Sequence, residues 1–178
     1  CIATTTVFVD VTPSPQNVTA ISNSTLTCST TTVSLTGNST TTGVNYSWSG
    51  PSSYTSAVQS PTDIVIAGDY TLTVTDPLTG CSSTATTTVI SNTTIPVVGV
   101  VSPAPVLGCN STVTLSVITG TIPPLNYSWS GPSSFTSTVQ SPTTSVAGDY
   151  TVTVTDPSNG CQNTVTITIG TSTVTPSF

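Results

Sequence analysis

Apolar and polar residues alternate along much of the chain with a period of two. Tyr150, Val152 and Val154 alternate with three threonines, and the stretch 164–169 alternates valine or isoleucine with threonine. Strands that bury one face of an antiparallel sheet show this pattern, and β-branched threonine suits the solvent face. Helical periodicity is absent. The pattern therefore predicts an all-β protein.

Turn residues divide the expected strands at regular intervals. Asp76–Gly80 and Asp156–Gly160 have the composition of hairpin connections. Ser-Gly-Pro at 49–51 and again at 130–132 ends a strand that carries a tryptophan. Six or seven short strands in about 80 residues predict an antiparallel β-sandwich of the immunoglobulin-like kind.

The chain contains an internal repeat. The stretch NYSWSGPSS at 45–53 returns unchanged at 126–134, 81 residues later. AGDYTLTVTDPLTGC, which ends at Cys81, is matched 80 residues later by AGDYTVTVTDPSNGC, which ends at Cys161. Self-similarity at a fixed period indicates tandem copies of one structural module.

The register of the repeat also predicts the domain organisation. Cys1 opens a C-x-x-T-x-T pattern that follows Cys81 and Cys161 as well. A lipidated N-terminal cysteine is an alternative reading of Cys1, but the repeat already accounts for a cysteine there. We expect the last strand of a preceding repeat at 1–11, Ig-like repeat 1 at 12–93, Ig-like repeat 2 at 94–171, and the start of a further repeat at 172–178.

Each repeat has one tryptophan and one tyrosine placed to anchor a small core. Val44, Tyr46 and Trp48 share one side of their strand, which turns Trp48 inward. The Gly-Asp-Tyr before each penultimate strand lies where a tyrosine corner would form, with the phenol bonded back to the backbone. We therefore expect Trp48 with Tyr70, and Trp129 with Tyr150, as core anchors.

These motifs resemble a known family. The order C-x-S-T-V-x-L, Y-S-W-S-G-P, G-D-Y-T-V-T-V-T-D and G-C is similar to the Ig-like and PKD-like tandem repeats of large secreted bacterial surface proteins. The resemblance covers nearly the whole chain. It implies extracellular adhesin, stalk or spacer modules without catalysis. The near-absence of charge departs from a generic adhesin and favours a packed fibre.

Composition excludes several functions. Charged residues make up 3% of the chain, all six are aspartates, and Lys, Arg and His are absent. Without cations the chain cannot neutralise phosphates, so we expect no nucleic-acid partner. No apolar run approaches the ~20 residues needed to cross a bilayer, so we expect no membrane insertion. Nucleophilic catalysis needs a base such as His or Lys, so we expect no enzyme, and no cofactor. The 43 Thr and 28 Ser must provide solubility instead of charge.

Five cysteines at repeat positions, Cys1, Cys28, Cys81, Cys109 and Cys161, indicate structural disulfides in an oxidising compartment. With no His and no Cys-x-x-Cys pair we expect no metal site. Pairing within repeats would give Cys28–Cys81 and Cys109–Cys161. However, these positions fall at opposite ends of a sandwich, about 25 Å apart, whereas disulfide Cα atoms lie within about 7 Å. The geometry favours a Cys28–Cys161 bond between repeats, with Cys81 and Cys109 bonded to upstream and downstream neighbours, and leaves the first pairing open.

Two further sets of residues have polar chemistry. Four aspartates recur near turns, Asp69, Asp76, Asp149 and Asp156, and we interpret them as turn caps because calcium needs more carboxylates. Seven N-x-S/T sequons are candidates for glycosylation: Asn17, Asn23, Asn38, Asn45, Asn92, Asn110 and Asn126.

Three functions fit the sequence. The first is a structural module of an extracellular, disulfide-stabilised surface fibre or stalk, whose partners are neighbouring repeats of the same long chain or identical chains. The second is a cell-surface adhesin that binds glycans or another cell through exposed Trp48, Trp129, Tyr54 or Phe135. The third is a passive spacer for a remote functional domain. Near-identity between repeats favours the first and the third.

Overall fold

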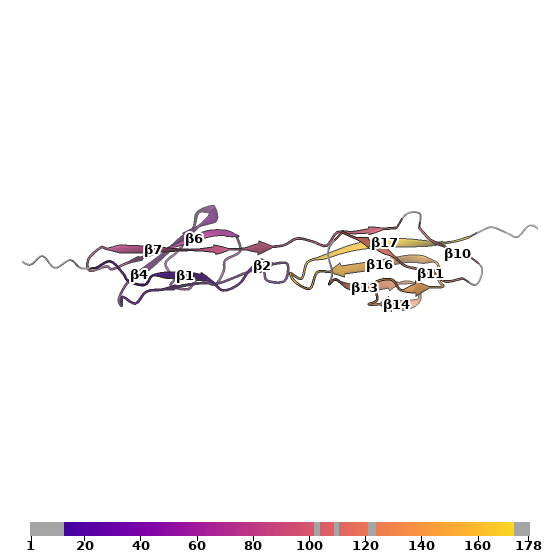
Figure 1. The fold of residues 1–178 in the computed structure, drawn as a ribbon, viewed down its shortest axis with the longest axis horizontal. Coiled ribbons are helices and arrows are strands. Elements are labelled where there is room, and N and C mark those ends of the chain that lie inside the picture. The colour runs from indigo at the N-terminus through magenta and orange to yellow at the C-terminus, as the bar shows by residue number, and fades with distance from the viewer. Residues whose placement is uncertain (1–12, 102–103, 109–110, 121–123, 173–178) are drawn as a thin grey trace, which may run out of the picture. The chain divides into compact units, whose positions relative to one another are not determined.

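The computed structural model describes residues 13–101, 104–108, 111–120 and 124–172. The expected strand at 1–11, Cys1, Cys109, Asn110 and nearly all of 172–178 lie outside them. The chain forms two compact units (Figure 1). Unit 1 comprises Cys1–Leu26 and Thr30–Ser91, and unit 2 comprises Thr27–Ser29 and Asn92–Phe178. The chain thus enters unit 2 briefly at Thr27–Ser29 and returns to unit 1.

Unit 1 consists of short antiparallel strands, as the alternation predicted. A four-stranded sheet has the order β5-β4-β6-β7, and β1 pairs with β3 in a smaller sheet that the bridge Val33–Ile64 extends. β2 pairs with β8. The elements are β1 (Thr19–Ser22), β2 (Leu26–Thr27), β3 (Leu35–Asn38), β4 (Asn45–Gly50), the 3-10 turn η1 (Pro51–Ser53), β5 (Tyr54–Ser56), β6 (Gly68–Thr75), β7 (Ser82–Val89) and β8 (Ser91–Asn92).

Unit 2 repeats this plan. Its largest sheet has the order β10-β17-β16-β13-β14, in which only the β10–β17 pair is parallel, and two-stranded sheets β12-β9 and β11-β15 complete it. The elements are β9 (Val98–Val100), β10 (Val106–Leu107), β11 (Val113–Thr114), β12 (Val117–Thr119), β13 (Asn126–Gly131), η2 (Pro132–Ser134), β14 (Phe135–Ser137), β15 (Thr143–Thr144), β16 (Gly148–Thr155) and β17 (Gln162–Thr171). The fold is therefore two Ig-like β-sandwiches in tandem, as predicted.

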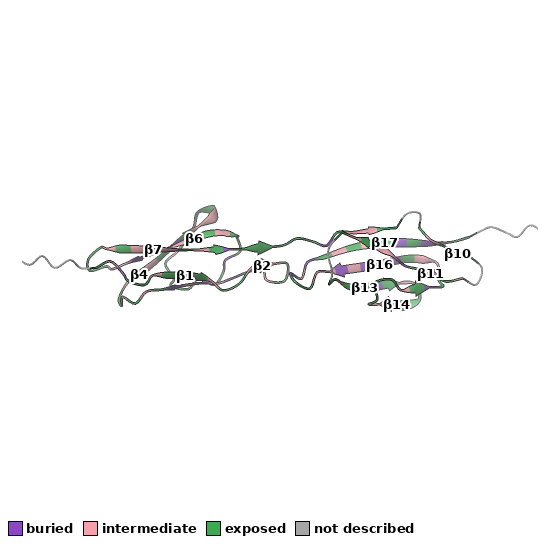
Figure 2. Ribbon diagram, in the orientation of Figure 1, coloured by how far each residue is buried: buried purple, intermediate pink, exposed green. Residues whose placement is uncertain are grey.

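Each unit has its own hydrophobic core, and the alternation of burial follows the sequence. In β16 every second residue, Tyr150, Val152 and Val154, is fully buried, while the threonines between them are partly exposed (Figure 2). The predicted anchors Trp48 and Trp129 are at most 1% exposed. Because a tryptophan or tyrosine buries 150–250 Å² of surface, these few side chains dominate the stability of such small cores.

The repeated NYSWSGPSS stretch is explained by packing around one tyrosine. A Cβ on Gly50 would lie 2.4 Å from the ring of Tyr70, so only glycine fits against that ring. The next residue, Pro51, packs against Gly68, whose φ of +138° an L side chain rarely adopts. Unit 2 repeats both contacts, between Gly131 and Tyr150 and between Pro132 and Gly148. The phrase therefore specifies the strand end and turn that close over the core tyrosine.

The core tyrosines form the expected corner. Tyr70 donates its hydroxyl hydrogen to the carbonyl oxygen of Ile66 over 2.9 Å, and Tyr150 donates to Val146 over 2.8 Å. The edge-to-face ring partner of Tyr70 is Tyr54, with centroids 5.4 Å apart. The sequence had paired Tyr70 with the tryptophan. Tyr54 takes this place because it follows η1 and begins β5, which returns antiparallel beside β4.

Candidate functional sites

A disulfide joins Cys28 to Cys161, which lie 133 positions apart in the sequence and have Cα atoms 5.0 Å apart. By the repeat alignment Cys28 belongs to repeat 1, whereas Cys161 follows the last hairpin of repeat 2. Both cysteines lie in unit 2, because Thr27–Ser29 belongs to that unit. We call Thr27–Ser29 the docked segment and Asp156–Cys161 the docking turn.

The docking turn is shaped by its own sequence. The Asp156 N–H donates to the Cys161 carbonyl over 2.9 Å, and the Gly160 N–H donates to the Asp156 carbonyl over 2.8 Å. The Asp156 carboxylate accepts bonds from the hydroxyl and the N–H of Ser158, at 2.6 and 2.8 Å. These bonds from Ser158 hold the pKa of the Asp156 carboxyl below its ordinary value. Gly160, with φ of +71°, completes the turn in a conformation that favours glycine.

The docked segment contacts the turn closely beside the disulfide. The Ser29 N–H and hydroxyl both donate to the Asn159 carbonyl, each over 3.3 Å. A Cβ on Gly160 would lie 2.7 Å from the Cβ of Ser29, so the glycine also makes room for the segment. Cys161 is completely buried. Cys28 is exposed, so a reducing agent reaches the bond from the side of the docked segment.

Asn159 is the buried polar residue of this site, with 1% of its surface exposed. Its amide donates to the Asn92 side-chain oxygen over 3.2 Å and to the Thr94 carbonyl over 2.9 Å. Its own side-chain oxygen accepts from the Cys161 N–H over 2.9 Å. Asn159 therefore fixes the segment that follows β8 onto the turn that carries the disulfide. The sequence pattern did not predict this role, although repeat 1 has Thr79 where repeat 2 has Asn159.

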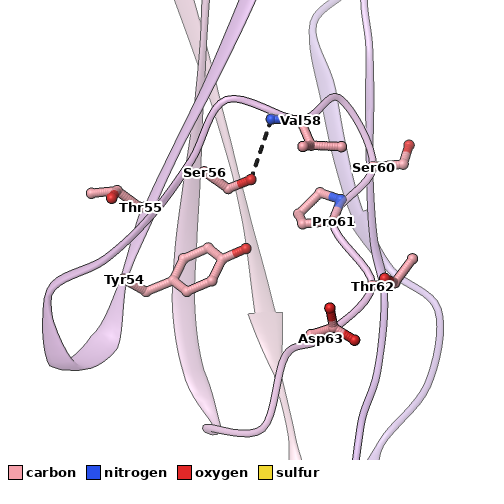
Figure 3. Close-up of a pocket in the computed structure, with 8 residues that line it drawn as sticks. All are labelled: Tyr54, Thr55, Ser56, Val58, Ser60, Pro61, Thr62 and Asp63. Carbon is pink, nitrogen blue, oxygen red and sulfur yellow. Dashed lines mark hydrogen bonds between the residues drawn. The ribbon is translucent and has the colours of Figure 1, made fainter.

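A small groove in unit 1 is the second candidate site. Its volume is about 290 Å³, and the residues that line it come from β5 and from the segment after it: Tyr54, Thr55, Ser56, Val58, Ser60, Pro61, Thr62 and Asp63. The Tyr54 phenol and the Asp63 carboxylate face the groove from its two sides (Figure 3). The groove thus brings an aromatic ring together with a carboxylate and hydroxyl groups.

Two of the four aromatic side chains that the adhesin alternative requires at the surface are buried in the cores. Trp48 and Trp129 are buried, and their indole N–H groups donate to the carbonyls of Gln59 and Val139, over 3.2 and 3.0 Å. A ligand cannot stack on either tryptophan, so their proposed role as a platform is wrong. Alternation on β4 and β13 places both on the core face. Tyr54 is partly exposed, as is Phe135 in unit 2.

The recurring aspartates fall into two kinds. Asp76 accepts the Leu78 N–H over 2.9 Å and caps its turn, as Asp156 does. Asp69 lies in β6 and accepts the hydroxyl of Thr88 over 2.5 Å, directly across the β6–β7 pair. Asp149 does the same with Thr168. For these two, the expectation of turn caps is wrong, because each is already inside a strand and bonds across the sheet.

The candidate glycosylation sites lie at the surface wherever the structure describes them: Asn17, Asn23, Asn38, Asn45, Asn92 and Asn126 are all exposed. Among the described residues, no group of three His, Cys, Asp or Glu side chains is placed to hold a metal ion. Within that same part of the chain, no helix has the length and apolar character required to cross a bilayer.

Comparisons with known proteins return similar solved structures but no family. No family profile and no curated protein matches the chain. Among solved structures, it is similar to the three N-terminal domains of the bacteriophage RB49 highly immunogenic outer capsid protein, with 20% identity, a TM-score of 0.48, and coverage of 89% of this chain and 59% of that one. It is also similar to the titin I-band fragment I67–I69, with 11% identity, a TM-score of 0.45, and coverage of 89% and 63%.

A third similar structure is extracellular domains 3–5 of Drosophila OTK, with 13% identity, a TM-score of 0.42, and coverage of 88% of this chain and 60% of that one. The chain spans about three fifths of the length of each of these solved chains. All three consist of tandem domains. At TM-scores below 0.5 these likenesses carry no argument about function, and the Ig-like assignment rests on the strand order of each unit.

Proposed function

We propose that the chain is a structural segment of an extracellular, disulfide-stabilised surface fibre or stalk built from tandem Ig-like repeats. The observation that carries the proposal is the bond between Cys28, in the sequence of repeat 1, and Cys161, at the end of repeat 2. Structural disulfides persist in oxidising compartments outside the cytosol. Neighbouring repeats of the same kind are the proposed partners.

The position of the bond suits a part that carries tension. Residues 29–160 lie between the two bonded cysteines. A force applied at the two ends of the chain therefore passes through the disulfide and does not extend the peptide between them. A passive linker has no need of such a bond, since flexible peptide already spans a distance at low cost.

Surface chemistry supports the same role. The chain has no Lys or Arg, so proteases of trypsin specificity have no cleavage site. Hydroxyl side chains and exposed sequons such as Asn45 and Asn126 provide a polar surface that sugars can extend. The sequence contains no His, Lys or Glu to act as the base for a nucleophile, so the proposal includes no catalysis.

The proposal is tested by locating the protein on cells that make it. Antibodies raised against the chain, used with gold labelling and electron microscopy on intact cells, are expected to decorate extended surface filaments along their length. Reducing the cells under mild conditions is expected to weaken or fray the labelled filaments. Label inside the cytoplasm, or confined to discrete spots at filament tips, would contradict a fibre-forming role.

An adhesin is the second candidate, because the groove of unit 1 combines the Tyr54 phenol with the Asp63 carboxylate. A glycan array tests it with the wild-type chain and the double variant Tyr54→Phe, Asp63→Asn. Unit 2 already has Phe135 at the position of Tyr54, so the Tyr54→Phe change reproduces the ring that unit 2 carries there. Binding that the double variant abolishes would favour the adhesin, and no binding by either protein would favour the fibre.

A further inference from the structure

The docking turn of unit 2 has a structural copy in unit 1. In the turn Asp76–Cys81, the Asp76 N–H donates to the Cys81 carbonyl over 2.9 Å and the Gly80 N–H donates to the Asp76 carbonyl over 2.8 Å. Both distances equal those of the docking turn. Gly80 has φ of +73°, against +71° for its counterpart. The two turns therefore present the same backbone and a cysteine at the same position.

The two copies differ in what covers them. In unit 2 the docked segment occupies the space beside Gly160, and the neighbouring cysteine is bonded and completely buried. In unit 1 no described atom lies within 4 Å of a Cβ built on Gly80. The Cys81 thiol is free and partly exposed. In unit 2 this turn binds a peptide segment of the same chain, whereas in unit 1 the space beside the equivalent glycine is open.

We propose that the turn Asp76–Cys81 is a second docking turn, which receives the Leu-x-Cys segment of a neighbouring repeat and is closed by a disulfide to Cys81. This deepens the proposed fibre, on which it rests, by naming the joint between its parts. The occupant has the chemistry of the docked segment, a cysteine followed by a residue whose N–H can donate to the turn. The leucine before it, Leu26, lies in the core of unit 1. In this chain the segment Leu107–Asn110 has the same pattern 81 residues later. A second copy of the chain therefore carries a matching segment around Cys109.

The receiving contacts are available in unit 1, with one change. The carbonyl of Thr79 takes the place of the Asn159 carbonyl that accepts from the docked segment. The Thr79 hydroxyl accepts from the Cys81 N–H over 3.2 Å, as the Asn159 side chain does from Cys161 in unit 2. Threonine does not provide the two amide donations of Asn159. Docking at unit 1 therefore depends more on the covalent bond.

Closing the joint is an oxidation that needs an acceptor for two electrons. Glutathione disulfide serves as this oxidant: two protein thiols and one glutathione disulfide give one protein disulfide and two molecules of glutathione. The attacking thiolate forms a mixed disulfide with glutathione, and the second protein thiol displaces the glutathione thiolate. In the cell, the oxidant is of the same chemical class, a disulfide that exchanges with thiols.

The test mixes full-length chains of two isotopic labels, each with Cys1→Ser, in a glutathione redox buffer. Digestion with a non-tryptic protease and mass spectrometry then identify disulfide peptides that combine both labels. Random pairing of two thiols would give the 81–81, 81–109 and 109–109 peptides in a ratio of 1:2:1. The proposal predicts that the yield of mixed-label Cys81–Cys109 peptides is at least nine times the combined yield of mixed-label Cys81–Cys81 and Cys109–Cys109 peptides.

A pair of glycine variants controls for folding. Gly80→Asn fills the space of the docked residue, and asparagine tolerates positive φ. Gly43→Asn changes another glycine of unit 1 with φ of +73° and nothing described within 4 Å. The first is expected to lower the Cys81–Cys109 yield at least tenfold and the second to leave it unchanged, with Cys28–Cys161 intact in both.

Three outcomes overturn the proposal: pairing at the random ratio, a Cys81–Cys109 bond within single chains, or equal yields from both glycine variants. If filaments are labelled on cells while any of these holds, the fibre stands and its joint is formed elsewhere. If the joint forms but no filament is labelled, the docking turn stands and the proposed function is wrong.

Discussion

Removing the Cys28–Cys161 bond is expected to change how far the chain extends under force. With the bond intact, only the residues before Cys28 and after Cys161 lengthen when the chain is pulled from its ends. These are 27 and 17 residues, so the released contour length is at most about 160 Å at about 3.5 Å per residue. Breaking the bond also releases the peptide between the cysteines, which lie 133 positions apart, and lengthens the extended chain by about 450 Å.

Single-molecule force spectroscopy measures this difference directly. Handles attached through peptide tags at both termini leave the cysteines untouched, and the variant Cys28→Ser is compared with the matched control Cys81→Ser. Full extension of Cys28→Ser is expected to be about fourfold that of the control. A reducing agent is expected to convert the control to the long extension while leaving Cys28→Ser unchanged.

Two results of the pulling experiment would contradict this prediction. If the Cys81→Ser control extends by the full contour length under oxidising conditions, the disulfide does not lie in the path of the force. If Cys28→Ser and Cys81→Ser both extend by an intermediate length, the cysteines pair differently, and the peptide protected from extension is a single repeat.

Three further predictions concern stability. Gly131→Ala places a Cβ 2.4 Å from the ring of Tyr150 and is expected to lower the free energy of unfolding by about 1–3 kcal/mol in urea titrations. The control Gly99→Ala, whose Cβ meets nothing within 4 Å, is expected to change the free energy of unfolding by less than about 0.5 kcal/mol. Asn159→Ala leaves buried hydrogen bonds unmade and is expected to cost about 1–3 kcal/mol in the same assay; a smaller loss would show that the amide contacts contribute little. The midpoint of thermal unfolding, measured against pH, is expected to show a plateau between two declines. Because folding lowers the pKa of Asp156, the stability that this carboxylate contributes is lost as pH falls below the ordinary pKa of 3.8. Because burial and the nearby Tyr54 phenol raise the pKa of Tyr70, stability is lost as pH rises above 10.0. A midpoint that changed steeply near pH 6–7 would contradict this, since the chain has no histidine.

Most of the fold could be predicted from the sequence because each signal is local. Alternation placed Tyr150, Val152 and Val154 on the core face, and the Asp-Pro-x-x-Gly turns marked the hairpins. The tyrosine corner followed from its position before the penultimate strand. These features depend on period and turn chemistry within a few residues, which a single sequence displays.

The site was harder to predict because it depends on contacts between distant parts of the chain. Nothing local showed that Ser29 would lie against Gly160, 131 positions away, or that Asn159 would bond to Asn92 and Thr94. The internal repeat offered one clue, a buried asparagine where the other copy has threonine. Ring packing also depends on how a loop folds back, so Tyr54 was missed as the partner of Tyr70.

The measurement that decides most directly whether the repeats are joined covalently is disulfide mapping of the native protein without reduction. A non-tryptic protease is required, because the chain has no Lys or Arg. We expect a disulfide peptide that contains Cys28 and Cys161. Peptides that join Cys28 to Cys81 and Cys109 to Cys161 would contradict it, and would make each repeat an independent module.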